Sequence, residues 1–118
     1  MEEVDMDSIL QSIKKFVGIH EEYTVFDEDI KMHTNTAFAI LTQLGVGPEE
    51  GFMIEGEDES WDEYITSATF SMVKSFVQLS VRLAFDPPSS AALLDSMERR
   101  LAELTWRLEI EGQKNSSQ

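Results

Sequence analysis

Ser71 and Lys74 have the types and the spacing of a catalytic pair in this chain of 118 residues. They match the S-x-x-K motif of penicillin-recognising enzymes, in which a lysine activates a serine on the same helix face. The companion S-D-N and K-T-G motifs are absent from the sequence. Because a pattern with only two fixed positions is common by chance, we interpret the pair as an ordinary helix face.

Asp29 and His33 lie four residues apart, so that on a helix both side chains can reach one metal ion. No third ligand follows at helical spacing, and the other histidine, His20, lies in a connector beside Glu21 and Glu22. We therefore interpret both histidines as ordinary surface or interface residues. An enzyme that uses the carboxylates around Asp29 and His33 remains an alternative, and its activity should respond to metal chelation.

The acidic run from Glu55 to Glu63 offers oxygen ligands for calcium. An EF-hand loop requires ligands at alternate positions, glycine at the sixth position and glutamate at the twelfth. Gly56 comes too early in the run for that register. We interpret the run as a solvated acidic loop and predict that the protein has no metal and no cofactor.

Charge and composition narrow the function further. The chain holds 9 basic and 23 acidic residues, a net charge of −14, and it has no cysteine. Residues 1–65 carry 17 acidic and 3 basic residues, whereas residues 66–118 carry 6 of each. A sequence-independent grip on nucleic-acid phosphates is made by Lys and Arg and is therefore not expected. No secretory signal and no apolar run of about 20 residues is present, so we expect no membrane association.

Hydrophobic periodicity predicts an all-α bundle of four to five helices in a single domain over residues 1–112. The expected elements are Ser8–Val17, a helix from Thr24 or Asp27 to Leu44, an acidic loop over 49–60, a helix from about 61 to Phe85 broken around 61–69, and a long C-terminal helix from Ser89 or Ser90 to about Glu111. Residues 113–118 are expected to form a disordered tail.

Helix ends carry recognisable residues. Asp5 or Asp7 is expected to cap the first helix, and Ser60 with Glu63 fits a capping box. Gly112 is expected to end the last helix, because glycine commonly follows a helix C-terminus.

Apolar side chains recur on one face of most of these helices. In the helix that ends at Leu44, the predicted buried stripe is Ile30, Thr34, Ala37, Phe38, Leu41 and Leu44. We expect the helix that ends at Phe85 to be central, because it is apolar almost all round from Phe70. The last helix carries a heptad-like seam of Leu94, Met97, Leu101, Leu104 and Leu108. Trp106, beside this seam, either closes the core of the bundle or anchors an interface, and the sequence favours neither.

Three segments resemble the short head–tail connector proteins of tailed phages and prophages. They are Ile40-Leu41-Thr42-Gln43-Leu44-Gly45-Val46-Gly47-Pro48, Val81-Arg82-Leu83-Ala84-Phe85-Asp86-Pro87-Pro88-Ser89 and Leu104-Thr105-Trp106-Arg107-Leu108. The resemblance covers about residues 8–110 and rests on the order and spacing of the segments. It implies a structural head-completion adaptor that is not an enzyme. Such adaptors form a ring beneath the portal and join the capsid to the next connector or stopper and the tail.

The resemblance also implies where the chain works and what it meets. We expect it in the host cytoplasm before assembly and then in the virion neck, where DNA passes through the ring without specific binding. For the contact with the portal or the next subunit we predict Arg99, Arg100, Trp106 and Arg107. For the channel, where negative charge repels phosphates, we predict Glu55, Glu57, Asp58 and Glu59. A small acidic regulator or inhibitor that mimics DNA is the alternative.

Overall fold

The computed structural model describes residues 8–66 and 68–116. Its elements are α2 (Ile9–Phe16), α3 (Asp27–Gln43), α4 (Trp61–Tyr64), α5 (Phe70–Phe85) and α6 (Ala91–Ser116). Within these described ranges the chain forms no strand, and one isolated bridge pairs Ser8 with Ser60. The predicted all-α bundle with a long C-terminal helix is confirmed.

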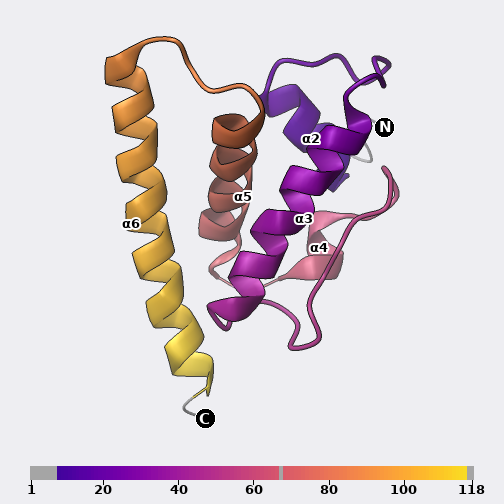
Figure 1. Cartoon of the computed structure of the whole chain (residues 1–118). Coiled ribbons are helices and arrows are strands. Elements are labelled where there is room, and N and C mark those ends of the chain that lie inside the picture. The colour runs from indigo at the N-terminus through magenta and orange to yellow at the C-terminus, as the bar shows by residue number, and fades with distance from the viewer. Residues whose placement is uncertain (1–7, 67, 117–118) are drawn as a thin grey trace.

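Helix α5 is the centre of the molecule. It packs against α3 and α6, and α2 contacts both α3 and α5. Figure 1 shows α6, α5 and α3 as neighbouring columns. The molecule is flat, with extents of 44 × 37 × 23 Å. The expected central place of the apolar segment from Phe70 is confirmed, because Val73, Val77 and Val81 are fully buried.

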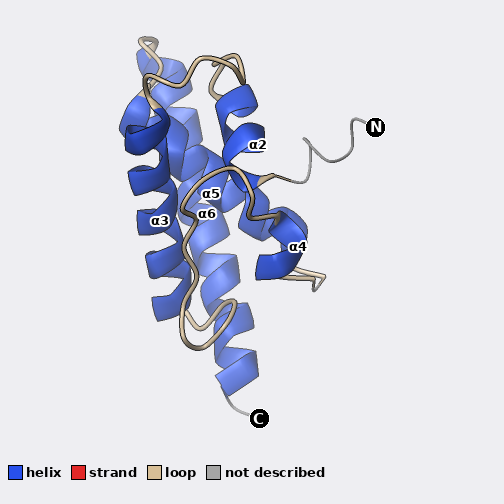
Figure 2. Cartoon of the chain, turned by 90° about the vertical axis from the view of Figure 1, so that its right-hand side faces the viewer, coloured by secondary structure: helices blue, strands red, loops and turns tan. Residues whose placement is uncertain are grey.

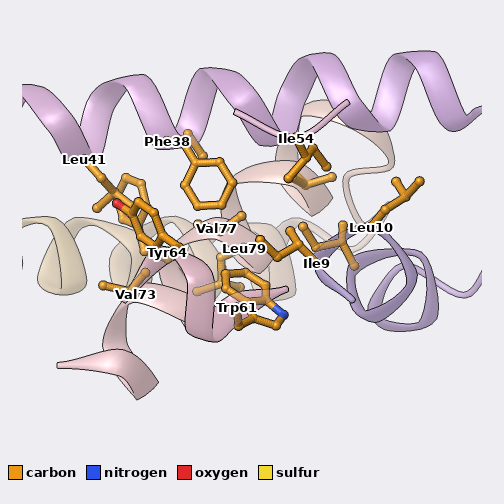
Figure 3. Close-up of a cluster of buried hydrophobic side chains, with 14 of the residues drawn as sticks. Ile9, Leu10, Phe38, Leu41, Ile54, Trp61, Tyr64, Val73, Val77 and Leu79 are labelled. Atoms are coloured by element: carbon orange, nitrogen blue, oxygen red, sulfur yellow. The ribbon is translucent and has the colours of Figure 1, made fainter. Parts of the chain in front are cut away.

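The core joins α2, α3, α5 and the short helix α4. Figure 3 shows Phe38 of α3 among side chains from the other elements, and its ring centroid lies 4.6 Å from that of Tyr64 and 6.2 Å from that of Trp61. The predicted buried stripe of α3 is confirmed at five positions: Ile30, Thr34, Ala37, Phe38 and Leu41. Edge and tilted aromatic packing of this kind adds to the stabilisation from buried area.

The structure shows which residues cap α2 and α4. Ser8 caps α2, because its Oγ accepts a hydrogen bond from the Gln11 backbone N–H at 3.3 Å, whereas Asp5 and Asp7 lie outside the described residues. The capping box at Ser60 is wrong. Its hydroxyl donates to the Asp62 carboxylate at 2.6 Å instead of accepting from the helix, and α4 is only one turn long. The Asp62 carboxylate therefore takes the Ser60 hydroxyl in place of the backbone N–H groups of the helix.

The predicted end of the last helix at Gly112 is also wrong. Helix α6 continues through this residue to Ser116, and its N-terminus is capped by Ser90, whose Oγ accepts from the Leu93 N–H at 3.2 Å. Gly112 instead allows a close contact between helices, because its Cα lies against the backbone of Leu44 and Gly45 at the end of α3. Of the expected tail, residues 113–116 are helical, and 117–118 lie outside the described residues.

The leucine seam of α6 is buried unevenly along its length. Leu104 and Leu108 are buried, whereas Met97 and Leu101 are only partly covered and pack on the edge of the core. Near the start of the helix Leu93 is 48% exposed. The helix is therefore held most firmly through its second half.

Candidate interaction surfaces

Lys74, which has catalytic spacing from Ser71 in the sequence, contacts two aromatic rings in the structure. The Lys74 ammonium lies 5.9 Å from the ring centroids of both Trp61 and Phe70, where it makes cation–π contacts. His20 accepts a hydrogen bond at Nδ1 from the Glu22 N–H at 3.1 Å, and so helps to shape its own loop. Across the described ranges, no group of three His, Cys, Asp or Glu residues could hold a metal ion.

None of the helices in the described part of the chain is long and apolar enough to cross a membrane.

The acidic loop is fixed in place by Asn35 of α3. The Asn35 side chain donates to the Ile54 carbonyl at 3.0 Å and accepts from the Ile54 N–H at 2.8 Å, as a neighbouring strand would. Ile54 is fully buried, whereas Met53 beside it is 62% exposed. Ile54 therefore holds this loop against the core, and Figure 2 shows the loop running along α3.

The four predicted channel residues of this loop are not equivalent. Glu59 accepts from the backbone N–H groups of Glu55 and Gly56 at 2.9 and 3.3 Å, so its carboxylate closes the turn. Glu57 accepts from the Gln11 side-chain amide at 2.6 Å on an exposed surface. Asp58 is exposed to solvent. The charge that is presented outward therefore comes mainly from Glu55, Glu57 and Asp58.

Carboxylates from three segments meet in an open acidic groove of about 730 Å³. Its acidic lining residues are Glu21, Glu22, Asp27, Glu28, Glu57 and Asp58. Lys31 is also at this groove, where its ammonium lies 2.8 Å from the Glu28 carboxylate and donates to the Glu55 carbonyl at 2.9 Å. The hydrogen bond to Glu28 and the nearby negative charges raise the pKa of Lys31.

Beneath the acidic groove lies a fully buried cation that the sequence did not reveal. Lys14 donates to the Glu21 carbonyl at 2.9 Å, and its ammonium lies 2.9 Å from the Asp27 carboxylate. Lys14 lies in the last turn of α2, and its exposure is 0%. Because a buried charge needs a partner, this lysine ties the 17–26 loop and the start of α3 to α2.

The outer face of α6 carries the predicted contact residues. Trp106 is 59% exposed, so the interpretation that it closes the core is wrong. Arg99 and Arg107 each pair with an acidic residue one turn earlier, Asp95 at 2.6 Å and Glu103 at 2.9 Å. Arg100 is exposed and has no ion pair within the described ranges. This face, defined by Asp95, Arg99, Ala102, Glu103, Trp106 and Arg107, is called the α6 outer face below.

The fold and these surfaces define a small helical protein with an acidic groove on one side and the exposed α6 outer face on another. A family model described as phage connector protein matches residues 9–115, almost the whole described chain, and the protein belongs to the phage connector protein family. This match confirms the resemblance seen in the sequence. No curated protein and no solved structure matches the chain.

Proposed function

We propose that this protein is a non-enzymatic head-completion adaptor that forms a ring beneath the portal. In this role it links the DNA-filled capsid to the next connector or stopper and to the tail, at the virion neck. The observation that carries the proposal is the family match over residues 9–115 of an all-helical chain.

A ring requires each subunit to use two different patches, because a head-to-tail contact repeated about an axis closes on itself. The molecule offers patches far apart: Figure 1 shows α6 at one edge, and the segment that carries Glu57 and Asp58 at the other. Exposed Trp and Arg residues are typical interface anchors. We therefore assign Arg99, Arg100, Trp106 and Arg107 to contact with the next subunit or the portal.

The test measures the mass of the protein by light scattering, first alone and then mixed with the portal protein of the phage or prophage that encodes this chain. We expect a closed ring or a stable portal complex. Alanine at Arg99, Arg100 and Arg107 should weaken that assembly, and a Trp106→Ala variant should weaken it further. A chain that stays monomeric and does not bind the portal contradicts the proposal.

The acidic loop is assigned to the channel, where its carboxylates would keep DNA from adhering. Because Glu59 closes its own turn, the informative variants are Glu55→Lys, Glu57→Lys and Asp58→Lys, combined. We expect a phage with these changes to release DNA slowly. The matched control reverses an exposed charge outside both the acidic loop and the α6 outer face, Asp86→Lys at the end of α5. Equal infectivity of the triple variant and the control contradicts a channel position.

The acidic groove favours one alternative function, a regulator whose carboxylates mimic DNA phosphates. Such a protein need not form rings and should bind a basic nucleic-acid-binding protein. Self-association in the light-scattering experiment distinguishes the two functions.

A further inference from the structure

One face of α3 is both exposed and uncharged. Residues 32–48 contain no Asp, Glu, Lys or Arg, in a chain in which 27% of the residues are charged. Met32 is 56% exposed and Ile40 is 39% exposed, and Thr36, Ala39 and Gln43 are exposed between and beyond them. These positions repeat at three- and four-residue spacing, so they share one side of the helix. We call this set of five residues the α3 stripe.

The stripe is separate from the buried side of the same helix. Thr34, Phe38 and Leu41 face the core, so α3 carries one apolar side inward and a second one outward. Within the described part of the chain nothing covers the outward side. The hydrogen-bonded loop at Ile54 follows a third side of the helix, marked by Lys31 and Asn35.

We propose that the α3 stripe binds the α6 outer face of a second copy of this chain, with Trp106 as the anchor. This inference deepens the proposed ring and rests on it, because it requires copies of the chain to associate with one another.

Charge determines which surfaces of two identical subunits can meet. Each subunit carries a net charge of −14, so contacts between acidic surfaces are opposed by repulsion. The α3 stripe has no formal charge at all. On the α6 outer face Arg99 pairs with Asp95 and Arg107 pairs with Glu103, and the exposed Glu98 and Glu109 lie only at its border. These two faces can therefore approach each other without bringing like charges together.

The chemistry of the two faces is also complementary. Trp106 supplies a large, exposed ring whose burial contributes strongly to binding. Met32 supplies a flexible thioether that adapts to an aromatic ring and makes favourable sulfur contacts with it. The two faces lie on different helices, on different sides of α5 (Figure 1), so the contact is head to tail and leaves one face of each copy free to bind a further copy.

Cross-linking tests the contact directly, because the chain has no cysteine of its own. Three exposed alanines serve as sites: Ala39→Cys in the stripe, Ala102→Cys on the α6 outer face and Ala68→Cys outside both surfaces. Two single-cysteine proteins of different mass tags are mixed at high concentration and joined with a short bismaleimide. We expect the Ala39→Cys and Ala102→Cys mixture to give at least about fivefold more mixed dimer than the Ala68→Cys and Ala102→Cys mixture. Equal yields overturn the proposal.

Charge insertion tests the same contact by a second route. Met32→Glu and Ile40→Glu place a carboxylate in the stripe at exposed positions, and each should weaken self-association roughly tenfold or more, as Trp106→Ala should. Val25→Glu is the matched control, because Val25 is also an exposed apolar residue and lies outside both surfaces. Circular dichroism confirms that each variant folds.

The outcomes separate this inference from the proposed function. Rings that form normally in Met32→Glu and Ile40→Glu overturn the α3 contact and leave the ring intact. Loss of portal binding with normal self-association overturns it too, because it assigns the stripe to another protein. If the unmodified chain shows no self-association either alone or with the portal protein, the α3 contact is overturned; if it also does not bind the portal protein, the proposed function fails as well.

Discussion

Gly112 in α6 and Leu44 at the end of α3 approach so closely that no side chain fits between them. A Cβ atom built on Gly112 would lie 1.7 Å from the Leu44 carbonyl oxygen and 3.1 Å from the Gly45 Cα. Both obstacles are backbone atoms, which cannot move aside as a flexible side chain can. This contact, between residues far apart in the sequence, fixes the second half of α6 against α3.

Gly112→Ala should therefore destabilise the protein although alanine is the better helix former. We expect a loss of about 3 kcal/mol in the free energy of unfolding, the upper end of the usual range for overpacking, because the obstacle is backbone. Denaturant unfolding followed by circular dichroism measures the loss. Gly56→Ala is the control, because a Cβ at Gly56 meets nothing within 4 Å. Equal stability of the two variants would show that α6 can shift freely.

The role of Gly112 could not be predicted from the sequence. Glycine followed by polar residues predicts the end of a helix, and at Gly112 that prediction was wrong, because a tertiary contact requires glycine inside the helix. The periodicity of α3 and α5, in contrast, predicted their buried sides correctly. Patterns within one helix are visible in a sequence, whereas the contacts between helices are not.

Lys14→Met should cost more than the loss of a surface lysine. The substitution leaves the Asp27 carboxylate without its cationic partner and the Glu21 carbonyl without a donor. Breaking a buried pair in this way costs about 3–5 kcal/mol, and the partial exposure of Asp27 places this case at the lower end. Thermal and denaturant unfolding measure the effect.

Two further variants check this interpretation. Lys15→Met removes an exposed lysine from the same turn, and its effect should stay within about 0.5 kcal/mol. Adding Asp27→Asn to Lys14→Met should recover part of the stability, because it removes the unpaired charge. If the double variant is no more stable than Lys14→Met, the ion pair does not explain the loss.

The interaction surfaces were partly accessible from the sequence. Charge counts located the acidic half, and the composition of the last helix indicated Trp106 and its arginines as surface anchors, one of two interpretations. The sequence did not show that Glu59 closes the turn of the loop whereas Glu57 is exposed, because the two residues differ only in what they contact after folding. Asn35 gave no signal either, since an asparagine within a helix is usually solvated.

Asn35→Ala should release the acidic loop from α3. Two backbone groups of Ile54 lose their partners, which costs about 1–3 kcal/mol where water cannot fully replace them. Amide hydrogen exchange should then accelerate at Ile54 while α5 stays protected. Thr36→Ala, one residue along, is the control, because the Thr36 hydroxyl bonds only within its own helix. Unchanged exchange at Ile54 would contradict the role of Asn35.

Tyr64 should make the fold sensitive to alkaline pH. Burial raises the pKa of its phenol to about 12, from about 10 in the unfolded chain. The folded state therefore holds the proton to higher pH, so this contribution is complete below pH 10 and is lost as pH rises from about 10 to 12. We expect the free energy of unfolding to fall by up to about 2–3 kcal/mol across that interval from this group.

Tyr64→Phe isolates this contribution. At neutral pH the variant loses only a long hydrogen bond of 3.4 Å to the Val46 carbonyl, worth about 1 kcal/mol or less. Between pH 10 and 12 its stability should decline less steeply than that of the unmodified protein, so that the two curves converge or cross. Tyr23→Phe, at a ring that is 50% exposed, should leave the steeper decline in place. Parallel curves for the unmodified protein and Tyr64→Phe would show that the buried phenol does not control alkaline stability.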